Sequence, residues 1–151
     1  MASRRATPVD CVEMNPSFEV RAIGIVASSL NDISEAPRQP DEGAPPAQLI
    51  FDSDVAEGLD SLAPGNQAIL LTWLDKADRS VLRVYPRGDL SRKPQGVFTT
   101  RSAHRPNPIG LHRVTVTDVS GNVVTVSGLE TINGTPILDL KPALSDQIDE
   151  R

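Results

Sequence analysis

The sequence has few of the residues on which several common protein classes depend. It holds one cysteine, Cys11, and two histidines among 151 residues, so it cannot form an internal disulfide and it lacks the usual structural zinc patterns. Its apolar runs are far shorter than the roughly 20 residues that span a bilayer. No apolar segment of the kind found in secretory signals follows residues 1–6. These absences favour a cytoplasmic protein with no membrane segment and no metal.

Aromatic residues and nucleotide-binding motifs are scarce as well. The five aromatic residues are Phe18, Phe51, Trp73, Tyr85 and Phe98, so the core must be built mostly from Val, Ile, Leu and Ala. The sequence has no Gly-Lys-Ser phosphate loop, no Gly-rich dinucleotide turn and no Gly-x-Ser-x-Gly elbow. Common nucleotide-binding folds and serine hydrolases are therefore excluded.

The net charge of −5 is distributed unevenly along the chain. Residues 79–113 contain eight of the 15 basic residues and only one of the 20 acidic residues. Such a segment can attract a polyanion while the acidic remainder limits indiscriminate binding. A solvated loop with an edge strand is the alternative interpretation of the same charges.

Short apolar and β-branched runs predict a series of strands. The run at 68–74 is apolar except for Thr72, which is typical of a strand buried on both faces. We expect strands at 18–27, 48–51, 67–74, 81–85, 96–100, 114–117, 124–127 and 137–140, one helical turn at 54–59 capped by Asp54, and a proline-rich loop at 35–47. These elements form one domain at 17–145, between a flexible N-terminal tail at 1–16 and a C-terminal tail at 146–151.

Two turns lie among the last strands. Residues 120–122 connect two alternating segments, and Asn133-Gly134 is typical of a two-residue β-hairpin. Many short strands with little helix favour an all-β fold, either a barrel or a sandwich.

The most informative stretch is 99–111, where two arginines, a histidine and an asparagine lie close to Pro106 and Pro108. Arg105 and Asn107 each precede a proline, so their backbones are restricted toward extended conformations. A stiff loop that presents polar side chains in fixed directions suits a binding site.

The segments 96–102, Gly-Val-Phe-Thr-Thr-Arg-Ser, and 104–111, His-Arg-Pro-Asn-Pro-Ile-Gly-Leu, resemble the signature of the TrmO family, also described as TsaA or YaeB-like proteins. Further segments at 22–26, 37–40, 73–78 and 129–142 are similar to the family and occur in its order.

This resemblance implies a single-sheet β-barrel with short strands and long loops, which forms a homodimer and binds S-adenosyl-L-methionine. It also implies methylation of N6 of a threonylcarbamoylated adenosine next to the anticodon of tRNA. By position, the cofactor contacts of the family fall on Arg38, Gln39, Pro40, Asp75, Lys76, Arg101, Leu111, Glu130, Thr131, Ile132 and Asn133. The implied substrate contacts are His104, Arg105, Asn107 and Lys141.

The chemistry of these residue types fits the cofactor. Its carboxylate suits Arg38 or Arg101, because charge-assisted pairs are strong, and its ammonium suits Asp75 or Glu130. Methyl transfer needs no metal, and positioning supplies much of the rate. The acceptor nitrogen must lose a proton, and Asp139 is our candidate base, oriented by Lys141 on the same strand face.

Two departures from the family pattern keep other functions open. Asp75 stands where many relatives carry histidine, and Asn133 replaces an aspartate. The alternatives are a methyltransferase of small molecules and a non-catalytic module that binds S-adenosyl-L-methionine. Several residues also have ordinary structural interpretations: Asn133 as a turn residue, and Asp139 with Lys141 as a surface pair.

Overall fold

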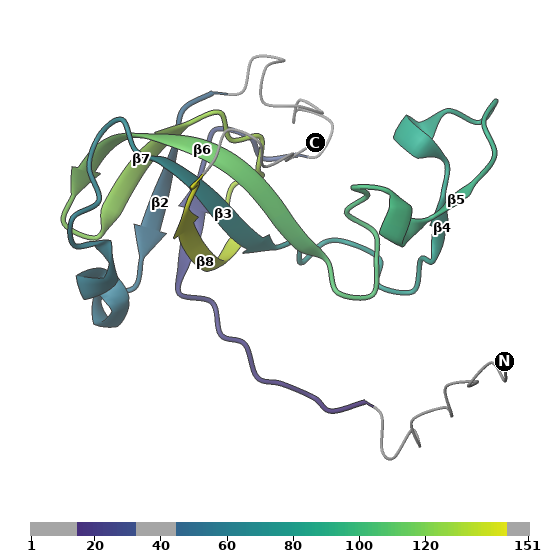
Figure 1. Ribbon diagram of the computed structural model, residues 1–151, viewed down its shortest axis with the longest axis horizontal. Helices are drawn as coiled ribbons and strands as arrows, with labels where there is room; N and C mark the ends of the chain where they lie inside the picture. The colour runs from purple at the N-terminus through teal and green to yellow at the C-terminus, as the bar shows by residue number, and fades with distance from the viewer. Residues whose placement is uncertain (1–14, 33–44, 145–151) are drawn as a thin grey trace, which may run out of the picture.

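The alternating segments of the chain form one closed sheet. The computed structural model describes residues 15–32 and 45–144. Its barrel has the strand order β1-β2-β7-β6-β3-β8, and β8 pairs with β1 to close it (Figure 1). The strands are β1 (Gly24–Ala27), β2 (Ala47–Phe51), β3 (Gln67–Trp73), β6 (Ile109–Ser120), β7 (Val123–Ser127) and β8 (Pro136–Pro142). The predicted all-β barrel is confirmed.

The interior of the barrel is filled by aliphatic side chains at the inward-facing positions of each strand. On β6 and β7 these are valines, which suit a pleated and half-buried surface, and Phe51 is the single aromatic side chain in the core. The buried core comprises Val26, Ala47, Leu49, Phe51, Leu59, Ala68, Leu70, Val114, Val116, Val124, Val126, Leu129 and Ile137. The scarcity of aromatic residues is therefore matched by a small barrel whose lumen aliphatic side chains fill.

The segment between β3 and β6, residues 74–108, projects from one end of the barrel, and we call it the arm (Figure 1). It contains the two-stranded sheet of β4 (Arg83–Val84) and β5 (Gln95–Gly96), with 3-10 turns η3 (Pro86–Gly88) and η4 (Val97–Thr99). The barrel end beside it, where β1, β3 and β7 finish, is the arm end. The opposite end, which holds the β6–β7 connection, is the hairpin end.

Two predicted strands are corrected by the pairing. The strand expected at 18–27 begins only at Gly24, where pairing with Phe51 and Ile137 starts. Ile23 still donates its N–H to the carbonyl of Ile137 and accepts the N–H of Asp52, and the residues before it extend beyond the barrel (Figure 1). Of the strand expected at 96–100, only Gly96 lies in a strand, β5, and Val97–Thr99 form the turn η4. The hydroxyls of Thr99 and Thr100 donate to the carbonyls of Gly96 and Val97 and close this turn.

The helical turn and the second hairpin also differ from the prediction. The turn η2 (Ser53–Leu59) has Asp52, not Asp54, at its N-cap position, and Asp54 instead accepts a hydrogen bond from Arg21 at 2.9 Å. Asn133 and Gly134 form a turn, but it does not join paired strands. β7 pairs with β2 and β6, whereas β8 pairs with β1 and β3.

Strands β2 and β3 closely match their predicted positions, and the turn at 120–122 joins β6 to β7 as expected. β6 is longer than predicted, because pairing with β3 extends it back to Ile109. Residues 1–14, 33–44 and 145–151 lie outside the described residues, and they include most of the predicted N-terminal tail, most of the proline-rich loop and the whole C-terminal tail. Among the residues placed in the structure, no helix has the length and apolar character needed to cross a membrane.

Leu70 tests the barrel core, because its side chain is 0% exposed. Replacing it with alanine should lower the free energy of unfolding by about 2–5 kcal/mol, since the cavity is only partly refilled. Leu82→Ala, at a side chain that is 61% exposed on the arm, is the matched control and should cost far less. Urea denaturation of both variants measures the difference, and equal losses would contradict the assigned core.

Candidate functional site

The arm end of the barrel carries a group of polar side chains on its inner side. Thr72, near the end of β3, lies opposite Gly110 on β6 and Ile137 on β8. Two residues further along β6, His112 lies opposite the core residue Leu70. Directly opposed residues share a face of the sheet, so Thr72 and His112 point into the barrel.

His112 connects two elements through both of its ring nitrogens. Its Nδ1 lies 3.1 Å from Oε1 of Glu130, and its Nε2 lies 2.9 Å from the hydroxyl of Thr72. The hydroxyl of Thr131 lies 3.5 Å from the same Nε2. Because an ionised carboxylate only accepts hydrogen bonds, the Nδ1 proton is donated to Glu130. The His112 side chain is 8% exposed, so the imidazole at the centre of this network is buried.

Gly110 makes room for the network. A Cβ atom at this position would lie 2.3 Å from Oγ1 of Thr72 and 2.6 Å from Nε2 of His112. Contacts this short do not occur at real Cβ atoms, so a larger residue would displace one partner. The glycine of the predicted signature is thus required inside the barrel.

Arg105 organises the loop between η4 and β6. Its guanidinium donates to the carbonyl oxygens of Ser102 at 2.7 Å, Val97 at 2.9 Å and Thr100 at 2.6 Å. Three charge-assisted bonds from one planar group fix the backbone geometry of the loop. The structure therefore places the guanidinium on the chain's own carbonyls.

Arg79 joins the two ends of the arm. It donates to the carbonyl of Pro106 at 2.7 Å and to Oδ1 of Asn107 at 3.1 Å. Its guanidinium also lies 5.2 Å from the centroid of the Trp73 ring, which is within cation–π range. The Trp73 side chain thus lies on the outer side of the barrel and does not pack in the core. Through Arg79 it supports the loop that contains Pro106 and Asn107.

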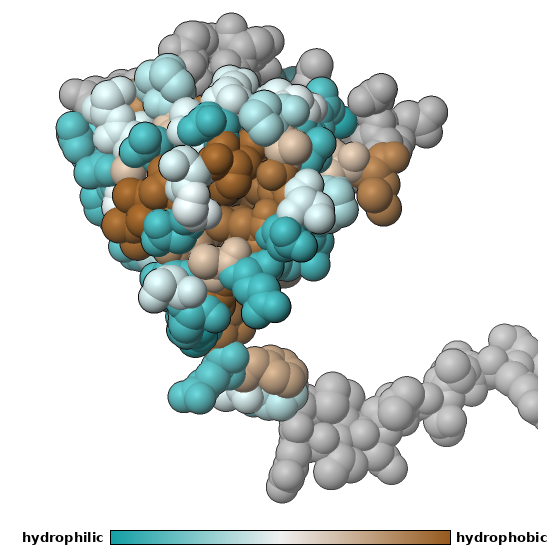
Figure 2. Space-filling view, turned by 90° about the vertical axis from the view of Figure 1, so that its left-hand side faces the viewer, coloured by the Kyte–Doolittle hydropathy of each residue, from teal (hydrophilic) through white to brown (hydrophobic). Residues whose placement is uncertain are grey.

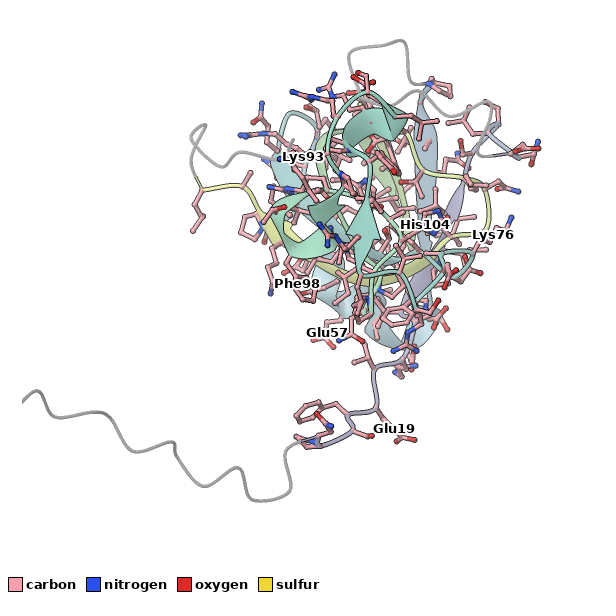
Figure 3. All side chains as sticks on the ribbon, turned by 90° about the vertical axis from the view of Figure 1, so that its right-hand side faces the viewer. Glu19, Glu57, Lys76, Lys93, Phe98 and His104 are labelled. Carbon is pink, nitrogen blue, oxygen red and sulfur yellow. The ribbon has the colours of Figure 1, made fainter. Side chains whose placement is uncertain are left out.

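His104 is held in a similar way. Its Nδ1 accepts the backbone N–H of Asp78 at 2.9 Å. The pKa of Asp78 is lowered because the hydroxyl and N–H of Ser80 donate to its carboxylate, with a further attraction from His104. In Figure 3, which faces the arm, Lys76 and His104 project on one side and Lys93 and Phe98 on the other.

Asp139 and Lys141 lie on the outer face of the barrel. They pair with Leu71 and Ile69 on β3, whereas Leu140 between them packs against the core. Nζ of Lys141 is 2.7 Å from Oδ2 of Asp139, which confirms the predicted pairing. The other oxygen of Asp139 accepts the N–H of Leu140 at 2.9 Å.

These two side chains also border a hollow of about 700 Å³ at the hairpin end. Its lining includes Ile23, Phe51, Leu59 and Leu62. Figure 2 faces this end and shows apolar side chains gathered inside a hydrophilic rim.

The predicted cofactor residues are brought together in part. Glu130 and Thr131 contact His112, while Asp75 follows β3 at the same end and donates its N–H to the carbonyl of Trp73 at 3.0 Å. Leu111 lies across from Leu71 on the outer face of that end. Lys76 and Ile132 directly follow Asp75 and Thr131 in the sequence, and Arg101 lies in the arm. Arg38, Gln39 and Pro40 fall outside the described residues.

Asn133 is fixed beside β1. Its Oδ1 accepts the N–H of Ser28 at 3.0 Å, and its own N–H donates to the carbonyl of Leu30 at 2.6 Å. It borders a second, smaller hollow at the arm end together with Gln48 and Thr125. The turn interpretation of this residue is confirmed, and a ligand contact stays a prediction.

Sequence reasoning missed His112, Thr72 and Arg79. The signal for His112 was its position in the strand: it faces inward, as do Gly110 two residues before it and Val114 two residues after it. A polar residue on an otherwise apolar phase is informative. In the described part of the chain, no three His, Cys, Asp or Glu side chains gather as metal ligands would.

The chain is similar to proteins of one family. Residues 25–150 match the family model described as tRNA-methyltransferase O N-terminal domain. A protein of Archaeoglobus fulgidus named S-adenosyl-L-methionine-binding protein is 38% identical over 130 residues, which cover 86% of this chain and 91% of that protein. A Rattus norvegicus protein named tRNA (adenine(37)-N6)-methyltransferase is 53% identical over 51 residues, or 34% of this chain and 12% of that protein.

The fold is also similar to that of solved structures. The crystal structure of TrmO from Pseudomonas aeruginosa has a TM-score of 0.69 and 28% identity, covering 89% of this chain. The chain spans 62% of that solved chain and 33% of a second Archaeoglobus fulgidus relative.

Gly110→Ala tests whether the inner polar network depends on close packing. It should lower the free energy of unfolding by about 1–3 kcal/mol, because Thr72 or His112 must move. Gly96→Ala, where an added Cβ has no neighbour within 4 Å, is the control and should be close to neutral. Thermal denaturation of both variants measures this. A neutral Gly110→Ala would show that the network tolerates displacement.

Proposed function

Because the chain belongs to the family of the tRNA-methyltransferase O N-terminal domain, we propose that it binds S-adenosyl-L-methionine at the arm end of the barrel and transfers its methyl group. The observation that carries this proposal is the grouping of Glu130, Thr131, Leu111 and Asp75 around the end of β3. These residues come from separate segments, and the family resemblance assigns all of them to the cofactor.

The cofactor lies at the rim between the inner and outer faces of this end. Glu130 or Asp75 offers a carboxylate to its ammonium, and Arg101 or Arg38 offers a guanidinium to its carboxylate. Lys76, the 130–133 segment and the 38–40 segment complete the contacts. Leu111 on the outer face provides an apolar surface for the adenine.

The acceptor is N6 of a threonylcarbamoylated adenosine next to the anticodon of tRNA. The name of the rat relative supports an adenine of tRNA. The eight basic residues at 79–113 also support it, since most of them lie in the arm beside the proposed cofactor site. Phosphate contacts dominate the affinity of nucleic-acid binding, so a basic arm suits this partner.

His104, Asn107 and Lys141 contact the acceptor, and Arg105 contributes by fixing the loop that carries the first two. Asp139 is the proposed base for the proton that leaves N6. Its pairing with Lys141 orients the carboxylate.

The chain acts as a homodimer in the cytoplasm. Apolar side chains on the outside support a second copy: Ile109 is 47% exposed beside half-buried Leu111 and Leu71. Phe18 and Phe98 are also exposed. A partner subunit on this outer face would lie next to the cofactor rim.

A small-molecule acceptor is the second candidate. The hollow at the hairpin end favours it, because Asp139 and Lys141 border an apolar space of a size that suits a small ligand.

Methyl transfer from labelled S-adenosyl-L-methionine distinguishes the two acceptors. We expect label in tRNA that carries the threonylcarbamoyl group but lacks the methyl group, and none in tRNA without that group. Label in a metabolite extract with unlabelled tRNA would select the small-molecule acceptor. Cofactor binding by calorimetry without transfer to either would leave a non-catalytic binding module.

Arg87 and Arg92 test the role of the arm. Reversing both charges to glutamate should weaken tRNA binding by about tenfold or more. The slope of the logarithm of the binding constant against the logarithm of salt concentration should become shallower by about one for each phosphate contact that is lost. Arg21→Glu, an exposed reversal outside the arm, is the control. Filter binding across salt concentrations measures both quantities, and unchanged slopes would remove the arm from the interface.

A further inference from the structure

The inner network at the arm end contains a histidine that the proposed reaction has not used. His112 lies on the inward face of β6, and its Nδ1–H donates to Oε1 of Glu130 at 3.1 Å. Thr72 holds the other side of the ring at 2.9 Å. The imidazole is thus clamped between β3 and the segment that contains Glu130 and Thr131.

The two carboxylate oxygens of Glu130 differ in their hydrogen bonding. Oε2 is enclosed and has no hydrogen-bond partner among residues 15–32 and 45–144. An enclosed acceptor without a donor carries a free-energy penalty, which a ligand with an N–H group can remove. The Glu130 side chain is 21% exposed, so the carboxylate lies near the boundary between interior and solvent.

We propose that His112 is a positioning residue that orients the Glu130 carboxylate so that Oε2 receives an N–H donor of the cofactor. This inference rests on the proposed function, since it assumes that S-adenosyl-L-methionine binds at this end. The cofactor's ammonium and adenine amino group both offer the required donor.

Three features support positioning over simple packing. The hydrogen bond to Oε1 restricts rotation of the carboxylate, and Thr72 restricts rotation of the ring. Gly110 leaves the space that the bond between His112 and Thr72 requires. A ligand group held in this way is preorganised, which reduces the cost of ordering it on binding.

Two conservative substitutions separate the two sides of the ring. The side-chain amide nitrogen of asparagine takes the place of Nδ1, so His112→Asn keeps a donor to Glu130 and loses the bond to Thr72. The amide of glutamine reaches the place of Nε2, so His112→Gln keeps Thr72 and loses the donor to Glu130.

Calorimetric titration of the full chain with S-adenosyl-L-methionine tests the inference. We expect the dissociation constant of His112→Asn to stay within about threefold of wild type and that of His112→Gln to rise about tenfold, as is typical when the partner that orients a ligating group is removed. In a Glu130→Gln background, His112→Gln should cause no further loss, because it acts through Glu130. Melting temperatures of all variants serve as the folding control.

The outcomes distinguish a failure of the proposed function from a failure of the role inferred for His112. If wild type shows no binding, the proposed function fails, and the role of His112 fails with it. If wild type binds and affinity follows the melting temperature, His112 is only structural and the inference is overturned. The inference is also overturned if both substitutions bind like wild type, or if His112→Gln weakens binding equally with and without Glu130.

Discussion

The pairing of β3 along both of its edges is the constraint on which this molecule depends. β6 pairs with one edge and β8 with the other, so this mostly apolar strand is hydrogen-bonded on both sides within the barrel wall. Where β3 ends, the chain leaves the sheet as the arm and returns as β6. The same register brings Thr72, Gly110 and His112 to one point inside the barrel. The fold and the candidate site therefore have a common origin.

The two faces of the sheet separate the chemical groups of the site. Inward positions hold Thr72 and His112, which meet Glu130 and Thr131 from the connection to β8. Outward positions hold Leu111, Asp139 and Lys141. A ligand that uses both sets must lie across the rim of the barrel, which explains why the proposed site needs residues from several loops.

Alternation of apolar and polar residues predicted the segments at 114–117 and 124–127, because it reports directly on which face of a strand is buried. β3 was predicted from its almost continuous apolar run instead, and the choice of a barrel over a sandwich came from the family resemblance. The sequence could not predict that residues 18–22 extend beyond the sheet, since the start of β1 depends on partners far along the chain. Thr99 and Thr100 formed a turn because their hydroxyls compete with strand pairing for backbone carbonyls. For the candidate site, the loop that contains Pro106 and Pro108 was evident from the sequence. Its support by Arg79 and Trp73 could be recognised only once the fold was known.

A crystal structure of the protein with S-adenosyl-L-methionine tests the central claim most directly. The account predicts the cofactor at the arm end, against residues 130–132 and the end of β3, with a nitrogen of the ligand within hydrogen-bond distance of Oε2 of Glu130. A cofactor in the hollow at the hairpin end, with no contact to Glu130, would contradict it.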